Sequence, residues 1–268
     1  MVEICCGSYY DAKQAALGGA ERIELNCALA LGGLTPTASV VRMVKESLPL
    51  KVIAMVRPRG GGFCYSAEDF EVMKAECRAV LEAGADGAAF GCLDEDARID
   101  AARSRELISI IRDMGGEAVF HRAFDCVRDP FAAMEQLIGL GVDRVLTSGQ
   151  KPKACDGVEL LRQLQERYGS RIELLAGSGV NASNAAEIIE KTGLSQVHSS
   201  CKDWLTDPTT VQNGVSYSMA GGEHSLCYDV VSAELVKKIL ERVNAADPQE
   251  KESAEECSGK SPERAINA

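Results

Sequence analysis

Four segments of the chain repeat one pattern, in which a helix-like stretch ends at a glycine and a short apolar run follows. The segments begin at Gly18, Ala83, Leu140 and Thr192 and read GGAERIEL, AGADGAAF, LGVDRVLT and TGLSQVHS. Their matching glycines are 65, 57 and 52 residues apart. These intervals are too long for one strand–helix unit and fit two, so the pattern predicts a regular alternation of strands and helices.

The sequence between the repeats supplies one more strand and helix each time, which gives eight of both. Short apolar, β-rich runs predict strands at 2–6, 22–26, 51–57, 87–91, 117–122, 144–148, 172–177 and 196–200. Apolar residues at helical spacing predict helices near 9–18, 36–47, 67–83, 101–114, 129–140, 157–168, 182–192 and 229–244. This alternation implies a parallel sheet, either open and doubly wound or closed. The even repeat count and the absence of G-x-G-x-x-G after the first strand favour a single-domain (β/α)8 TIM barrel.

The barrel is expected to occupy residues 1–245, because a barrel of this class needs about 250 residues. The sequence from 246 to 268 contains few apolar residues and many charged ones. Such a composition predicts a disordered acidic and polar tail, since it cannot bury enough apolar surface to fold.

Charge and targeting signals restrict the function classes. The net charge of −11 disfavours binding to a nucleic-acid backbone. No apolar run approaches the roughly 18 residues of a membrane span, and the N-terminus lacks the features of a signal peptide. The 11 cysteines include no C-x-x-C pair. We therefore expect a cytoplasmic protein without a membrane partner, in which most cysteines are small buried hydrophobes.

Polar residues occupy alternate positions of the predicted strands, so they share one face of each strand. Glu3 and Cys5 lie on one face of the first strand, and Glu24 and Asn26 lie on the corresponding face of the second. The opposite faces are apolar and suit contact with the surrounding helices. The polar faces are therefore expected to point into the barrel.

Two further charged side chains are expected inside. Arg57 lies on the same strand face as Met55, two residues before it. His121 lies on the strand face opposite to that of Phe120 and Arg122. Two acids, an arginine and a histidine in one barrel could neutralise one another, as buried charges require. The alternative is a salt-bridge network that only fills the barrel, above all for Glu3, the deepest acid. Function in barrels resides at strand C-termini, which favours a functional role for Glu24, Arg57 and His121.

Three loops after strands carry groups suited to bind substrate. The run from Arg57 to Gly62, with Arg59 between, fits a mobile lid or an anion clamp, and its alternative is a simple flexible connection. The Gly177-Ser178-Gly179 turn precedes a helix, where phosphate groups commonly bind in barrels. The third loop is the 121–125 cluster, in which a histidine and a carboxylate could act as acid and base, unless Arg122 and Asp125 pair with each other.

The candidate residues fall into two groups. The candidate catalytic residues are Glu3, Glu24, Arg57, His121 and Asp125. The candidates for binding a substrate or anion are Asn26, Arg59, Arg122, Ser148, Gly177, Ser178, Gly179 and His198.

The cysteines suggest a metal site. Adjacent residues of a strand face opposite ways, so Cys5 and Cys6 cannot chelate together. Cys5 alone points inward, near the position of Asn26, whereas Cys27 is one residue too far along to share that face. Thiolates are soft ligands that select Cu(I). The candidate metal ligands are Cys5 and Cys27, and the alternative is that both are small buried residues.

Several long motifs, in order along residues 2–200, give the sequence a resemblance to a known family. They read Glu-Ile-Cys at 3–5, Gly-Gly-Ala-Glu-Arg-Ile-Glu-Leu at 18–25, Gly-Gly-Leu-Thr-Pro at 32–36, Arg-Pro-Arg-Gly-Gly at 57–61, Phe-His-Arg-Ala-Phe-Asp at 120–125 and Leu-Thr-Ser-Gly at 146–149. Together they resemble the CutC family. The resemblance implies a TIM barrel, a cytoplasmic homo-oligomer (dimer or tetramer) and a role in copper homeostasis with Cu(I) bound through cysteines.

The chain departs from the family pattern at three positions. Asn26 stands where the pattern has a second cysteine, Gly62 replaces an acid, and Ser178 interrupts a run of three glycines. The candidate active-site residues are kept, whereas the two-thiolate metal site lacks one ligand.

Two hypotheses follow for the function. The first is a cytosolic copper-handling protein that binds Cu(I) through Cys5 and Cys27. The second is a cofactor-independent lyase, isomerase or hydrolase acting on a small polar or phosphorylated anionic substrate, with Glu24 and His121 as general base and acid. No cofactor motif is visible, which leaves Cu(I) as the one ligand that the sequence suggests. A scaffold that only oligomerises does not explain an inward cluster of charges.

Overall fold

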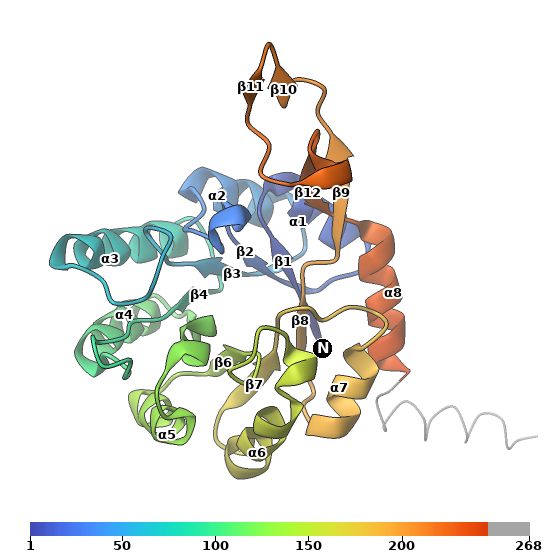
Figure 1. Ribbon diagram of the computed structural model, residues 1–268. Coiled ribbons are helices and arrows are strands. Elements are labelled where there is room, and N and C mark those ends of the chain that lie inside the picture. The colour runs from blue at the N-terminus through green and yellow to red at the C-terminus, as the bar shows by residue number, and fades with distance from the viewer. Residues whose placement is uncertain (246–268) are drawn as a thin grey trace, which may run out of the picture.

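The computed structural model describes residues 1–245, and the expected tail at 246–268 lies outside the described residues. Within them, eight parallel strands follow one another around a closed barrel, with β8 paired to β1 (Figure 1). The strands are β1 (Val2–Cys6), β2 (Arg22–Leu25), β3 (Lys51–Met55), β4 (Gly87–Phe90), β5 (Glu117–Phe120), β6 (Arg144–Thr147), β7 (Glu173–Ala176) and β8 (Val197–Ser199). The predicted (β/α)8 TIM barrel is confirmed.

A ring of helices surrounds the barrel (Figure 1). In the described chain they are α1 (Tyr9–Leu17), α2 (Ala38–Ser47), α3 (Ala67–Glu82), α4 (Ala101–Asp113), α5 (Pro130–Leu140), α6 (Val158–Tyr168), α7 (Ala185–Thr192) and α8 (Ala233–Asn244). Their ends follow local chemistry. Ser66 and Asp69 form a capping box at the start of α3, and Gly141 and Gly193 end α5 and α7 in the left-handed region.

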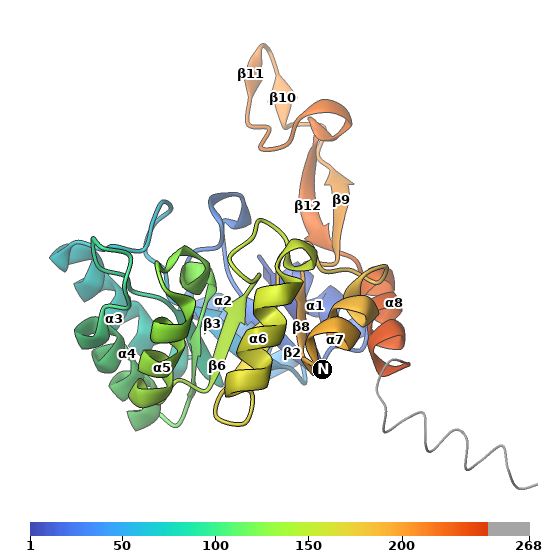
Figure 2. The ribbon, with the colours of Figure 1, turned by 60° about the horizontal axis from the view of Figure 1, so that its bottom comes forward.

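The sequence prediction missed an arm that interrupts the last strand–helix unit. Strands β9 (Lys202–Thr206) and β12 (Cys227–Val231) pair antiparallel, and β10 (Val211–Gln212) pairs with β11 (Val215–Ser216) beyond them. Figure 2 shows this arm standing above the end of the barrel to which the strands point. The helix predicted over 229–244 was wrong at its start, because residues 227–231 form β12 and α8 begins at Ala233.

The base of the arm is fixed to the barrel by hydrogen bonds. The buried carboxylate of Asp11, in α1, accepts from the backbone N–H groups of Gly7 and Val231. The N–H of Ser232 donates to the carbonyl of Cys201 at 3.0 Å. These contacts place the start of β9 and the end of β12 beside the mouth of the barrel.

The interior of the barrel is divided into an apolar side and a charged side. A small apolar cluster inside it comes from β3, β4 and β5 and consists of Ile53, Met55, Ala89 and Val119. The same strands also carry charge at their N-terminal ends, where Lys51 of β3 pairs with Glu117 of β5, and Glu117 lies 3.3 Å from Arg144 of β6. The fully buried charged side chains within the strands themselves come from β1, β2, β6 and β8.

Two arginines neutralise the acids at the bottom of the barrel. Arg22 lies 2.6 Å from the Glu3 carboxylate (Nε to Oε2), and Arg144 lies 2.7 Å from that of Glu173 (Nη2 to Oε2). Both arginines are only 3% exposed. This arrangement matches one of the two interpretations of Glu3, a salt-bridge network that fills the barrel. The arginines also stabilise the ionised carboxylates, which would be costly to bury without a partner.

Removing Glu3 is expected to destabilise the barrel strongly. Glu3→Ala leaves Arg22 as a buried cation without its partner, and breaking such a pair costs about 3–5 kcal/mol. Urea unfolding of the full chain measures this loss. The control is Arg162→Ala, which removes an ion pair with Glu159 and Glu166 on the surface of α6 and is expected to leave the midpoint close to that of the wild type. A Glu3→Ala protein as stable as the wild type would show that the buried pair does not support the barrel.

Candidate functional site

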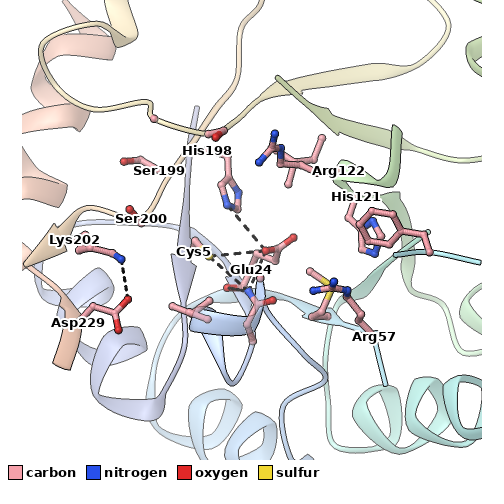
Figure 3. A pocket seen from close by; sticks show the side chains of 18 residues that line it. Cys5, Glu24, Arg57, His121, Arg122, His198, Ser199, Ser200, Lys202 and Asp229 are labelled. Carbon is pink, nitrogen blue, oxygen red and sulfur yellow. Dashed lines mark hydrogen bonds and ion pairs between the residues drawn. The ribbon is translucent and has the colours of Figure 1, made fainter. Parts of the chain in front are cut away.

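The C-terminal ends of the strands open into a cavity of about 330 Å³ (Figure 3). Nine of the residues predicted from the sequence line it: Cys5, Glu24, Asn26, Arg57, His121, Arg122, Ser178, Gly179 and His198. The lining also includes residues that the sequence reasoning did not single out: Leu29, Gly32, Met55, Phe63, Leu146, Ser199, Ser200, Lys202 and Asp229. The cavity therefore combines groups from most of the strand ends with the base of the arm.

Three potential metal ligands converge on the floor of this cavity. One ligand atom each of Cys5, Glu24 and His198 lies within 4.8 Å of the other two. The Glu24 Oε2 atom is 4.0 Å from both the Cys5 Sγ and the His198 Nε2. Register explains the arrangement, because Cys5 pairs with Glu24 across β1 and β2, and β8 lies on the other side of β1.

Neighbouring polar groups orient these three side chains. The Nδ1 of His198 is 2.9 Å from the Glu3 Oε1, so that its Nε2 faces Cys5 and Glu24. The Asn26 amide donates to the Glu24 Oε2 at 3.0 Å and lies 3.7 Å from the Cys5 sulfur. A histidine whose second nitrogen is held by a carboxylate is a common arrangement at metal sites.

Burial and charge set opposite protonation states within this cluster. Burial alone would lower the pKa of His198, but the nearby Cys5 thiol and the carboxylates of Glu3 and Glu24 raise it well above its ordinary value. Burial alone would raise the pKa of Glu3, but His198 and Arg22 lower it. The resting pair is therefore a Glu3 carboxylate and a His198 imidazolium. Burial raises the pKa of both Glu24 and Cys5, which favours their protonated forms.

His121 differs from His198 in both charge and partner. Its Nδ1 accepts a hydrogen bond from the Ala123 N–H at 3.1 Å, so the neutral ring carries its proton on Nε2. Burial, with help from the positive charge of Arg57, lowers the pKa of His121 to about 3. The Nε2 is buried and has no hydrogen-bond partner in the described part of the chain. His121 is thus a neutral donor beside the cavity.

Arg57 holds loops in place, in addition to lining the cavity. Its guanidinium donates to the carbonyls of Leu31 and Gly33, each at 3.0 Å, and to that of Gly61 at 2.6 Å. It also lies over the Phe63 ring, 5.2 Å from the centroid. The side chain therefore helps to bind the loop after β3 to the loop after β2, alongside hydrogen bonds between Thr35 and the Arg57 backbone.

Asp125 lies behind the cavity and positions Arg122. The two side chains form an ion pair of 2.8 Å (Nε to Oδ2), as one reading of the sequence proposed. The Asp125 carboxylate also accepts from the Thr147 hydroxyl at 2.6 Å and from the backbone and side chain of Ser148. Ser148 in turn accepts from the Arg122 Nη2 at 2.9 Å.

The remaining predicted residues lie outside the lining of the cavity. The Arg59 guanidinium pairs with Asp69 at 2.8 Å and stacks over the Tyr65 ring. Gly177 lies where a side chain would collide with Leu146, so its role is close packing.

Cys27 lies apart from the three-residue cluster. Its thiol donates to the carbonyl of Thr35 at 3.1 Å, and its backbone forms a bridge with Leu34. Consequently Cys5 converges with His198 and Glu24 and has no second thiol in the group that could hold a metal.

The sequence reasoning passed over Arg22 and Arg144. Strict alternation along β2 and β6 could have found both, because Arg22 is two residues before Glu24 and Arg144 is two before Leu146. Lys202 and Asp229, which pair at 3.0 Å, come from the arm and gave no signal, since the arm itself was not predicted.

Comparison with known proteins identifies the family. The CutC family model matches residues 1–203 of the chain. The chain belongs to the CutC family. It is 44% identical over 216 residues to a CutC family protein of Treponema denticola, covering 81% of this chain and 87% of that protein. It is 38% identical over 247 residues to the human copper homeostasis protein cutC homolog, covering 91% of this chain and 90% of the human protein.

A solved CutC structure agrees with the fold. The crystal structure of CutC from Streptococcus agalactiae matches this chain with a TM-score of 0.71 at 29% sequence identity. The match covers 75% of this chain and 98% of the streptococcal one. Among the described residues of this CutC protein, no helix is both long and apolar enough to cross a membrane.

The two cavity histidines are expected to hold opposite charge states in the metal-free, reduced protein. Because the pKa of His198 is raised well above 6.5, its ring should remain an imidazolium from pH 6 to 8. Because the pKa of His121 is about 3, its ring should remain neutral, with the proton on Nε2, down to pH 5. Nitrogen-15 NMR of labelled histidine distinguishes these states, with His198→Gln and His121→Gln to assign the signals. A neutral His198 ring at pH 7, or titration of His121 near pH 6.5, would contradict the electrostatics of the cavity.

Proposed function

We propose that this CutC protein takes part in copper handling by binding one Cu(I) ion as cargo at Cys5, His198 and Glu24. The observation that carries the proposal is the convergence of these three donor atoms within 4.8 Å on the floor of the cavity. The human and mouse relatives are both named copper homeostasis protein cutC homolog, which agrees with it.

The donor set suits Cu(I). Thiolate and imidazole are ligands that copper prefers, whereas hard cations such as Mg²⁺ select oxygen. The Glu3 carboxylate holds the other nitrogen of His198, which fixes the ring and makes Nε2 a better donor. Glu24 supplies the third donor through a carboxyl oxygen.

This site replaces the two-thiolate arrangement that the sequence suggested. Asn26 occupies the second cysteine position and binds Glu24, while the Cys27 thiol is engaged with Thr35. In this proposal His198 takes the place of the missing sulfur ligand.

Binding must release protons, which makes the affinity depend on pH. Burial raises the pKa of the Cys5 thiol, and the pKa of His198 is also raised, so both groups carry a proton at neutral pH. A metal ion requires a thiolate and a neutral imidazole. Raising the pH removes these protons and therefore tightens binding.

A Cu(I) titration of reduced protein against a chromophoric chelator tests the proposed ligands. The wild type is expected to bind one equivalent, Cys5→Ser to lose that binding, and His198→Gln to weaken it by a factor of about 10–100 or more. Cys27→Ser is the matched control and is expected to bind like the wild type. Equal losses in Cys5→Ser and Cys27→Ser would contradict the site, as would binding that persists in Cys5→Ser.

The same titration repeated between pH 6 and 8 tests the proton release. If both Cys5 and His198 give up a proton, the dissociation constant is expected to fall by about 100-fold per pH unit. In His198→Gln only the thiol proton remains, and the fall should be about tenfold per unit. An affinity that does not change with pH would show that the ligands are already deprotonated or are not these residues.

A further inference from the structure

The cavity contains hydrogen-bond donors and positive charges that a bound cation would not use. The His121 Nε2–H is buried, and the described residues provide no acceptor for it. A buried donor without an acceptor is costly, which makes it a candidate contact for a ligand oxygen. Figure 3 shows His121 and Arg122 on the side of the cavity opposite Lys202 and Asp229, with Glu24 between them.

The turn after β7 presents backbone donors to the same cavity. Ser178 and Gly179 both have positive φ, at +80° and +68°, and both line the cavity. Within residues 1–245, no acceptor is found for the N–H groups of Ser178 and Gly179, nor for that of Ser200 after β8. Consecutive N–H groups in such a turn form a concave site for anions.

Cations line the same cavity, although the whole chain is acidic. Arg57, Arg122 and Lys202 line the cavity, against the two acids Glu24 and Asp229. Asp125 and Ser148 hold Arg122 through its Nε and Nη2, and the Nη1 has no partner in the described structure. The side chain of Lys153 also crosses the turn, since a Cβ added at Gly179 would lie 3.2 Å from the Lys153 Cγ.

Position in the fold agrees with an anion site. In (β/α)8 barrels, phosphate groups commonly bind to the backbone of the loops after strands 7 and 8. Here Ser178 and Gly179 follow β7, and Ser200 follows β8. The cavity of about 330 Å³ is at the small end of the range for ligand sites, which fits a short-chain phosphate ester.

We propose that this cavity binds a small phosphomonoester of a polyol or sugar, with its phosphate at the Ser178–Gly179 turn and Arg122, which contact the neighbouring carbonyls of Pro152 and Lys151. A hydroxyl or carbonyl oxygen of the same molecule accepts the hydrogen bond of the His121 Nε2–H. This site is distinct from the ligand set proposed for Cu(I) and requires no metal.

The experiment is a titration of the metal-free full chain with inorganic phosphate and with glycerol 3-phosphate, followed by backbone amide NMR and calorimetry. Shifts are expected first at Ser178 and Gly179, and the ester is expected to bind at least tenfold more tightly than inorganic phosphate. Shifts scattered over exposed lysines, or an ester that binds no better than phosphate, would overturn the proposal. Because no copper is present, the result is independent of the Cu(I) site.

Two arginine variants distinguish a specific anion-binding site from a general effect of net charge on anion binding. Arg122→Gln is expected to weaken both probes at least tenfold, because it removes a charge-assisted contact. Arg162→Gln changes the net charge equally but lies on the surface of α6, outside the cavity, and is expected to bind like the wild type. Equal losses in the two variants, or no loss in Arg122→Gln, would contradict the proposal.

Two further variants cover the case in which Arg122→Gln does not fold. Lys153 is exposed, and Lys153→Gln is expected to weaken phosphate binding several-fold while the thermal midpoint stays the same. His121→Phe is expected to abolish the preference for glycerol 3-phosphate over inorganic phosphate, measured as the ratio of the two affinities. A preference that survives in His121→Phe would show that the ester oxygen binds elsewhere.

Discussion

The ion cluster around Glu3 is the interaction on which the rest of the site depends. This buried carboxylate of β1 lies 2.6 Å from Arg22 on β2 and 2.9 Å from His198 on β8. The three strands adjoin at the point where the last strand of the barrel meets the first. The same contact therefore neutralises charge, links the closing strands and fixes the ring of His198 with its Nε2 toward Cys5 and Glu24.

The filling of the barrel differs from one part of its interior to another. Ile53, Met55, Ala89 and Val119 form an apolar cluster on the side of β3 to β5. The fully buried charges within the strands lie on β1, β2, β6 and β8, and each needs a partner because burial penalises an isolated charge. At the bottom of the barrel, these partners are other charged side chains. At the mouth, some polar groups lack a partner among the described residues, and these unpaired donors face the same cavity as the potential metal ligands.

The repeating order of strands and helices in the sequence was sufficient to predict the barrel. The alternation of residues along each strand was sufficient to predict that Cys5, Glu24 and Asn26 point inward, because alternation along a strand is a local property. The partners of Arg57 could not be predicted, since they are backbone carbonyls of a loop whose conformation depends on the whole fold. The arm was missed because its strands are largely exposed, so they lack an apolar pattern. His198 was found by its position in the last strand, but its pairing with Glu3 depends on closure of the barrel.

X-ray absorption at the copper edge of reduced full-length protein carrying one equivalent of Cu(I) tests the proposed copper site most directly. If Cys5, His198 and Glu24 hold the ion, the spectrum should show one sulfur neighbour with lighter nitrogen or oxygen neighbours. It should also show outer-shell scattering from an imidazole ring, which disappears in His198→Gln. A two-sulfur environment that is unaffected by His198→Gln and loses one sulfur in Cys27→Ser would contradict the site. That result would assign the ion to the two cysteines instead.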